Sequence, residues 1–446
     1  MLNEELVNKW QPVLDHAVLP EIKEGFRKTV TAHMLEQQEI AMREQAHNVG
    51  TASLLGESTV PHTQTANVDK FDPVLISLVR RTAPNLLAFD IMGVQPMSGP
   101  SGLIFALRPT YGNDNDGGLN GANAFYTEAN TAFSSGRGPD FPAADFNDGF
   151  ANAFFNPTAY GDGETPTLAQ ATGTDTAEEW GGASDANPIP SMSFNIDKST
   201  VTAKTRALKA EYSVELAQDL KAIHGLDAET ELANILTTEI NAEINREIVR
   251  AIYYGATQVT SVNAARGSLT AALPAASLDG RWLVERFKAL VFKLETEANV
   301  IAKQTRRGKG NLILCSADVA SALATAGVLD PTAALTVDDT GSTFAGTVGA
   351  GLKVYIDPYT VASDDFAVVG YKGSSPYDAG MFYCPYVPLQ MVRAIGEDNF
   401  QPKIGFKTRY GMGVNPFAQG NTKSQTILRG VNRYYRGFAI TALAGV

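Results

Sequence analysis

A stripe of apolar residues at a strict four-residue spacing runs through the middle of the chain. Its members are Leu232, Leu236, Ile240, Ile244, Ile248 and Ile252. Asp227 precedes them as a good N-cap, and acidic residues follow it in the first turn, where the helix dipole favours them. A four-residue step advances the stripe by roughly 40°, so five steps carry it about 200° around the axis. We predict a long spine helix whose two ends bury different faces; an ordinary core helix is the alternative.

Charged residues on the same helix are spaced for pairing with one another. Glu243 with Arg246, and Glu247 with Arg250, would lie on its exposed side. A second apolar pattern occurs near the N-terminus, where Ile22, Phe26, Val30 and Met34 recur after Pro20. This spacing predicts an amphipathic helix over residues 20–46. Residues 47–59 are small and polar, which is typical of a linker.

The remaining apolar segments alternate between strand and helix patterns. A strand is expected at 101–112, a pair of strands at 193–213, a helix that ends near Arg306, and a strand followed by a helix from 311. Further strands are expected at 353–359, 366–373, 387–396 and 426–443. We therefore predict an α+β chain in which residues 112–190 interrupt a long hairpin.

Charge separates the segment within the hairpin from the rest. The whole chain has a formal net charge of −12, and residues 112–190 carry −11 of it because twelve acidic residues there face only Arg137. Ten aromatic residues in the same segment are enough for a small core, which predicts a folded subdomain. Such a charge is best tolerated in water and is repelled by nucleic acid, so we expect this insertion on an outer surface.

The residues that usually carry catalysis or bind metals are scarce. Cys315 and Cys384 stand alone in apolar segments, and three of the five histidines lie in the first fifty residues. We expect two buried thiols, no disulfide, no cofactor and no catalytic constellation. Residues 346–351 are rich in glycine but lack the dinucleotide-binding spacing, and 113–117 resemble a calcium loop only faintly. No apolar run reaches membrane-spanning length, and the 19% charged fraction suits a protein with much of its surface in contacts.

Five long stretches resemble a known family. They are RRTAPNLLAFDIMGVQPMSGPSG (80–102), residues 203–248, VYIDPY (354–359), GYKGSSPYDAGMFYCPYVPL (370–389) and NFQPKIGFKTRYGMGVNPFA (399–418). They resemble the major capsid proteins of T-even-type tailed bacteriophages, including those that infect cyanobacteria. The resemblance is weakest in the acidic insertion.

The resemblance implies the Hong Kong 97-type tailed-phage capsid fold, with an inserted subdomain in its extended hairpin loop. The implied segments are a cleaved propeptide (1–57), an N-terminal arm (58–105), the extended loop (106–202), a peripheral domain with the spine helix (203–310), an axial domain (311–390) and return strands of the peripheral domain (391–446). The implied function is structural: hexameric capsomers in an icosahedral virion shell around double-stranded DNA, assembled in the host cytoplasm.

In this family a maturation protease removes the propeptide after a glutamate in a Leu/Ile-x-Glu sequence. Leu55, Gly56 and Glu57 match, which places the cut before Ser58. The pattern also occurs at residues 2–4, 22–24, 283–285 and 395–397, but only 55–57 lies in the predicted linker. The implied partners are other copies of the chain, a vertex protein, the protease, a scaffold core, decoration proteins and DNA bound without sequence specificity, with no membrane. The alternatives are the pentameric vertex protein of the same family and a nanocompartment shell protein.

Overall fold

The computed structural model describes residues 4–15, 22, 24–53, 86–111, 174, 178, 192–259, 262–263, 283–327, 329–330, 344–349, 351–360, 365–395, 401–418 and 427–441. The expected cleavage site at 55–58 lies outside these residues, and so does the acidic insertion at 112–190 apart from two isolated positions. The chain divides into two compact units. The first comprises Met1–Ile104, Ser199–Ile301 and Arg307–Val446, and the second comprises Phe105–Lys198 and Ala302–Arg306.

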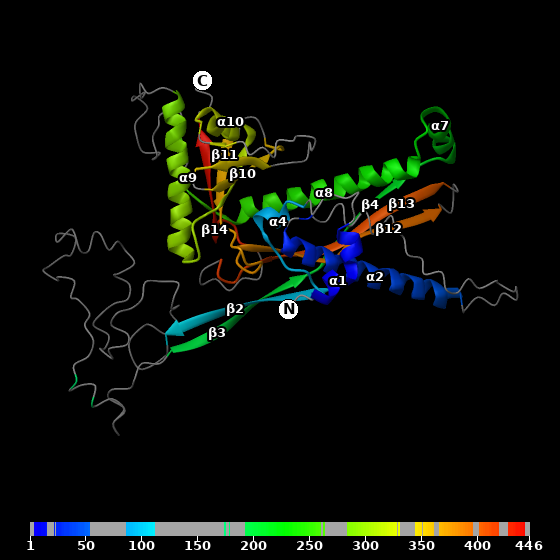
Figure 1. The fold of residues 1–446 in the computed structure, drawn as a ribbon, viewed down its shortest axis with the longest axis horizontal. Coiled ribbons are helices and arrows are strands. Elements are labelled where there is room, and N and C mark those ends of the chain that lie inside the picture. The colour runs from blue at the N-terminus through cyan, green and yellow to red at the C-terminus, as the bar shows by residue number, and fades with distance from the viewer. Residues whose placement is uncertain are drawn as a thin grey trace. The chain divides into compact units, whose positions relative to one another are not determined.

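The described helices include all four that were predicted from the sequence, together with three that were not. They are α1 (Glu4–Leu14), α2 (Gly25–Ser53), α4 (Ala88–Ile91), α7 (Val214–His224), α8 (Ala228–Gly255), α9 (Leu283–Thr305) and α10 (Ala317–Thr325) (Figure 1). Asp227 is the N-cap residue of α8, as expected, and Thr230 donates a hydrogen bond to its carboxylate. Both boundaries of the helix predicted at 20–46 were wrong, because α2 begins at Gly25 and continues to Ser53. It includes seven residues of the predicted linker, since that stretch contains no proline to stop the helix.

The strands make three sheets. They are β1 (Gly93–Val94), β2 (Ser101–Tyr111), β3 (Met192–Thr202), β4 (Lys204–Glu211), β5 (Ala256–Gln258), β6 (Val262–Asn263), β7 (Leu312–Ser316), β8 (Leu329–Asp330), β9 (Phe344–Val348), β10 (Leu352–Asp357), β11 (Asp365–Gly370), β12 (Met381–Ile395), β13 (Pro402–Val414) and β14 (Asn432–Thr441). One sheet has the order β1-β12-β13-β4, another β5-β14-β11-β7-β10-β9-β8, and β2 pairs with β3 alone. The mixture confirms the predicted α+β class.

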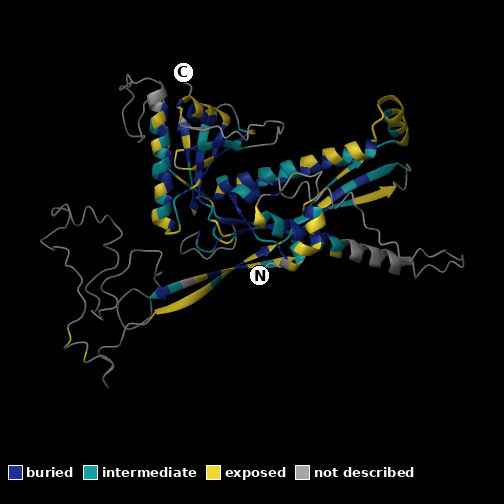
Figure 2. Ribbon diagram, in the orientation of Figure 1, coloured by how far each residue is buried: buried dark blue, intermediate teal, exposed yellow. Residues whose placement is uncertain are grey.

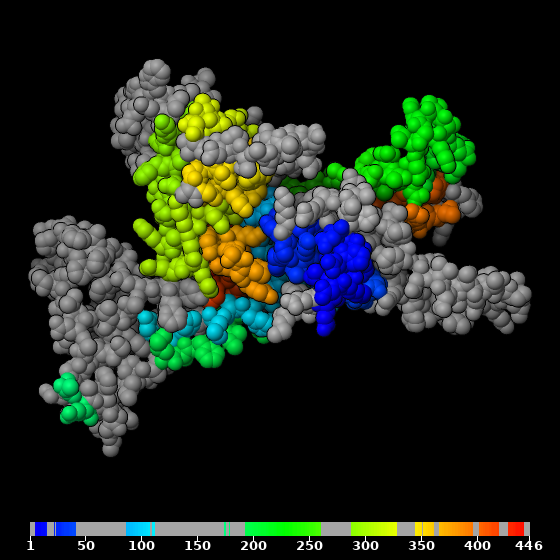
Figure 3. Space-filling model, viewed as in Figure 1, coloured from blue at the N-terminus to red at the C-terminus, as the bar shows by residue number. Residues whose placement is uncertain are grey.

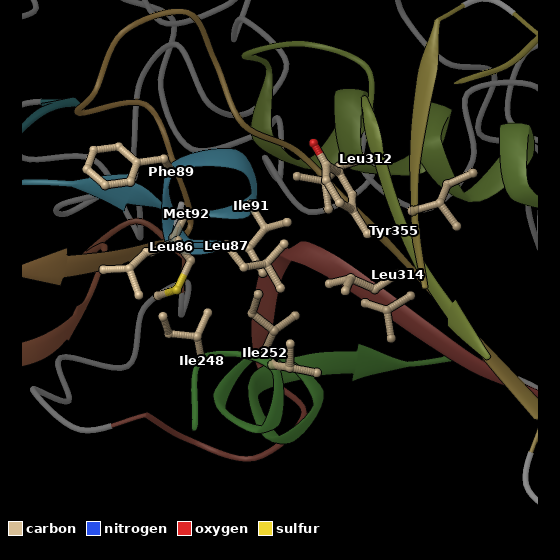
Figure 4. Packing of buried hydrophobic residues seen from close by; sticks show 14 of the residues in the cluster. Leu86, Leu87, Phe89, Ile91, Met92, Ile248, Ile252, Leu312, Leu314 and Tyr355 are labelled. Carbon is tan, nitrogen blue, oxygen red and sulfur yellow. The ribbon is translucent and has the colours of Figure 1, made fainter. Parts of the chain in front are cut away.

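Helix α8 connects the two larger sheets. It contacts β4 and β13 of the four-stranded sheet, and its C-terminal end continues into β5, which pairs with β14 of the other sheet. Figure 4 shows Ile248 and Ile252 packed near Leu86, Leu87 and the residues around α4, with strand β7 close by. A single apolar core therefore includes the spine helix, α4 and the strands of both sheets.

Both cysteines are buried, as predicted, and neither forms a disulfide. Cys315 lies in β7, whose five residues are all buried, and Cys384 lies in β12. Burial raises the pKa of both thiols to about 12, which leaves them protonated and unreactive at neutral pH. They act as small apolar residues of the core.

Candidate assembly surfaces

The hairpin of β2 and β3 carries an apolar face that is exposed among the described residues. The hydroxyls of Thr110 and Ser193 lie 2.9 Å apart, so these two residues share one face of the ribbon. Because side chains alternate along a strand, the opposite face receives large apolar residues from both strands. Within the second compact unit these are Phe105, Leu107, Met192, Phe194 and Ile196, each between 52% and 66% exposed. Figure 2 shows β3 as one of the most exposed strands.

The base of the hairpin, which belongs to the first compact unit, is packed in contrast. Ile104 and Val201 are buried in a small cluster with Phe382 and Cys384 of β12. Glycine at 413 in β13 makes this contact possible, because a Cβ there would lie 2.5 Å from Val201 Cγ2 and 2.7 Å from Ile104 Cδ1. The strands are thus anchored firmly at one end.

The spine-helix residues predicted from the sequence lie as follows. Leu236, Ile240, Ile244, Ile248 and Ile252 are each at most 6% exposed, whereas Leu232 is only half-buried. Leu232 falls within the first turns of α8, near the small helix α7, which has no buried residue of its own. Burial of the predicted stripe therefore begins at Leu236, about two turns into α8, although Ala228 in the first turn is buried as well.

Glu243, Arg246 and Glu247 of α8 pair with residues of other elements, and among the described ion pairs none joins them to each other or to Arg250, so the predicted pairing within the helix was wrong. Arg206 of β4 donates to Glu243 at 2.8 Å and also binds Glu247 and the Tyr410 hydroxyl. Arg246 binds Asp357 of β10 at 2.6 Å. The guanidinium of Arg206 reaches both carboxylates of one helix face from the neighbouring strand, and its several donors allow it to bind both at once.

Asp357 is the most buried of these charges. Its side chain is 2% exposed, and it accepts hydrogen bonds from Arg246, from the Tyr253 hydroxyl at 3.0 Å and from the Tyr359 amide at 3.0 Å. Burial, and then the nearby Asp357 carboxylate, raise the pKa of Tyr253 well above its ordinary value, so the phenol stays a donor. These contacts fix α8 to β10.

A groove of about 630 Å³ runs beside this network. Its lining includes Arg206, Arg246, Arg250 and the two exposed tyrosines Tyr254 and Tyr359, which are 54% and 61% exposed. The guanidinium of Arg246 lies 5.5 Å from the centre of the Tyr359 ring. Three glutamates in the lining balance the three arginines, so the groove has no net preference for anions.

The N-terminal helices lie on the first compact unit (Figure 3). Trp10 of α1 donates to Glu36 of α2 at 3.0 Å, and Lys9 binds Glu36 and Glu39, each at 2.7 Å. The predicted apolar stripe is mostly covered: Ile22, which precedes α2, and Met34 are 5% and 6% exposed, and Val30 is fully buried. The cover comes from the chain itself, because α2 packs along β12 and its residues join the main core.

The described residues hold no group of three or more His, Cys, Asp or Glu side chains placed to bind a metal ion. None of the described helices is long and apolar enough to cross a membrane. Sequence reasoning missed the apolar face of the hairpin and the network around Asp357. The hairpin face has a signal in the sequence: large apolar residues occupy every second position in both strands, at Phe105 and Leu107 and at Phe194 and Ile196. Among the described strands, β2 and β3 pair only with each other.

Residues 68–440 match the family model described as "Major capsid protein Gp23". The chain is 40% identical to the major capsid protein of Serratia phage KSP90 over 428 residues, covering 94% of this chain and 92% of the relative. It is 37% identical to that of Enterobacteria phage T4, covering 93% and 92%. The T4 capsid vertex protein is 28% identical over 52% of this chain and 55% of its own length. Among solved structures, the capsid of Myoviridae phage XM1 covers 79% of this chain and 91% of its own at 10% identity, with a TM-score of 0.40.

Proposed function

Because this chain belongs to the family of Gp23 major capsid proteins, we propose that many copies assemble as hexameric capsomers into an icosahedral shell around double-stranded DNA. The chain is a structural protein of the virion and not an enzyme. Its greater identity and coverage against major capsid proteins than against the vertex protein favour the hexameric role over the pentameric one. In such a shell the Hong Kong 97-type arrangement places each hairpin against a neighbouring subunit.

The apolar face of the hairpin is the observation that supports assembly. A two-stranded ribbon is marginally stable in water unless one face is covered. Covering a Phe or Leu side chain fully contributes about 1.5–3 kcal/mol. Five such side chains on one face of an isolated ribbon would be costly in a monomer and favourable at a repeated contact between copies.

Substitution on this face tests the assignment. We expect Phe194→Ser to abolish shell formation seen by electron microscopy, while the circular dichroism of the soluble chain stays that of the parent. Asn195→Ser is the matched control, since Asn195 points to the other face of the same strand, and it should assemble normally. Shells from the Phe194→Ser protein with the parental yield would exclude the hairpin face as an assembly contact.

Maturation by proteolysis is a second part of the proposal. Leu55, Gly56 and Glu57 match the cleavage pattern of the family, and a protease acting there would release α1 and α2 together and leave Ser58 as the new N-terminus. N-terminal sequencing of subunits from infectious particles tests this, and a start at another residue would refute the site. Glu57→Ala should keep the full-length chain in the particle.

The remaining partners follow from the same role. A vertex protein would close the five-fold corners, a scaffold core would guide assembly, and decoration proteins would bind the outer surface. Packaged DNA would be enclosed without sequence-specific contacts, and the acidic insertion would face away from it. Mass spectrometry of purified heads, before and after maturation, would identify which of these proteins are present.

A further inference from the structure

The first turn of α2 is joined to α4 by a compact group of charges. Arg27 binds Glu24, the residue that precedes α2, at 2.9 Å and also binds Asp90 of α4. Its guanidinium lies 5.5 Å from the centre of the Phe89 ring. From the other side, the ammonium of Lys372 donates a hydrogen bond to the Phe89 carbonyl. The short helix α4 is therefore held both by the N-terminal segment, which contains α1 and α2, and by the remainder of the first compact unit.

Four charged residues make up this group, and each side of the contact contributes one acid and one base. Glu24 and Arg27 belong to the N-terminal segment, whereas Asp90 and Lys372 belong to the part of the chain that would remain after its removal. Lys353 of β10 also acts on Lys372 and lowers its pKa, so Asp90 is the acid that opposes this repulsion once Glu24 has left. In the present arrangement burial lowers the pKa of Lys372 to about 8, while Asp90 and Glu24 oppose that effect. Asp90 is thus close enough to act on the lysine electrostatically while its hydrogen bonding goes to Arg27.

A second feature makes the contact easier to break. Gln38 of α2 is 1% exposed, and among the described residues neither the oxygen nor the nitrogen of its amide has a hydrogen-bond partner. An unpaired buried amide disfavours the docked state relative to one in which water reaches it. Helices α1 and α2 are joined by ion pairs and a hydrogen bond from Lys9 and Trp10 to Glu36 and Glu39, so the two helices would dissociate together.

Helix α4, which these contacts hold, is hydrogen-bonded to the core of the protein. The Tyr435 hydroxyl donates to the Ile91 carbonyl at 3.0 Å, and the Leu87 amide donates to the Asn245 side chain of α8 at 3.1 Å. Ile91 and Met92 are fully buried. A change in how α4 is held therefore acts on the spine helix and on β14 directly.

We propose that α1 and α2 form a releasable clamp on α4, and that Asp90 exchanges its ion-pair partner from Arg27 to Lys372 when the clamp leaves. The exchange rests on the proposed cleavage of the N-terminal segment. It gives α4 a second stable mode of attachment, so that loss of the segment changes the core without leaving a buried charge unpaired.

The clamp is tested on the full-length chain by amide hydrogen exchange. Arg27→Gln should speed exchange in the amides of residues 26–38 by at least threefold, on the order expected for a lost partly buried ion pair. Lys28→Gln is the matched control, because Lys28 carries the same charge one residue along and binds only the exposed Asp15 at 2.9 Å. Equal exchange in the two variants would refute the clamp. Gln38→Leu should slow exchange in the same amides, and faster exchange would contradict the role given to Gln38.

The partner exchange is tested on the same chain after it is cut by a sequence-specific protease whose site replaces residues 55–58. In the cut chain, Asp90→Asn and Lys372→Met should each speed exchange at residues 88–92, and the double variant should show little more than either alone. In the uncut chain, Asp90→Asn should match Arg27→Gln instead. Additive effects of the two substitutions after cutting would refute the exchange. Neither measurement requires a shell, so failure of the chain to assemble would overturn the proposed function and leave these results to stand separately.

Discussion

Replacing Arg246 with methionine removes the cationic partner of Asp357 while keeping much of the apolar length of the side chain. The Asp357 carboxylate is 2% exposed and would remain in place with hydrogen bonds from Tyr253 and the Tyr359 amide only. Removing one member of a buried ion pair typically costs 3–5 kcal/mol, because the other charge stays buried without compensation. The two remaining donors place the expected loss near the lower end, about 3 kcal/mol.

This loss should appear as a fall in the thermal unfolding midpoint of the unassembled chain by roughly 5 °C, given the usual relation between unfolding free energy and midpoint in large domains. Arg250→Met is the matched control, since Arg250 lies one turn further along the same helix with its side chain exposed, and it should change the midpoint little. Asp357→Asn in the Arg246→Met background should recover much of the loss, because the amide is neutral. An Arg246→Met protein as stable as the Arg250→Met protein would refute the reasoning.

Two further predictions concern the helices. Ile244→Asp places a carboxylate at a position that is only 3% exposed, so it should lower the free energy of unfolding by several kcal/mol and prevent shell formation. Ile235→Asp is the control, because Ile235 is 61% exposed on the same helix, and this variant should assemble. Normal shells from the Ile244→Asp protein would show that this position tolerates a charge. Burial alone would raise the pKa of Glu297, but hydrogen bonds from Lys293 and Arg436 bring it below the ordinary value of 4.5. Its stabilising contribution is therefore present at neutral pH and lost as pH falls below about 4.5, and Glu297→Gln should flatten that part of a melting-temperature profile; an unchanged profile would contradict this.

Helices and strands whose apolar residues repeat with a clear period were the elements that could be predicted from the sequence. The spine helix, the strand pairs and the buried cysteines follow from local spacing, because a helix or strand that buries one face must repeat apolar residues at 3.6 or 2 positions. The end of α2 could not be placed in the same way. Small polar residues suit a linker, yet they also tolerate a helix when nothing in the segment breaks it.

Contacts between distant residues could not be read from spacing. Arg27 and Asp90 are separated by 63 positions, and Arg246 and Asp357 by 111, so their pairing depends on the complete fold. The charges of α8 illustrate the difficulty: Glu243 and Arg246 are well spaced to pair on one helix, but Arg206 and Asp357 offer better-fixed partners once the strands pack. Local rules describe what a helix can do alone, and tertiary packing selects among those options.

The spine helix shows why this selection matters for a shell protein. Its apolar stripe turns around the axis, so the N-terminal part meets β4 and β13 while the C-terminal part enters the core beside α4 and β7 (Figure 4). Arg206 on one sheet and Asp357 on the other then bind charges that lie within one turn of each other on α8. Because apolar packing is non-directional whereas hydrogen bonds between a guanidinium and a carboxylate are directional, these ion pairs favour one orientation of the helix against each sheet.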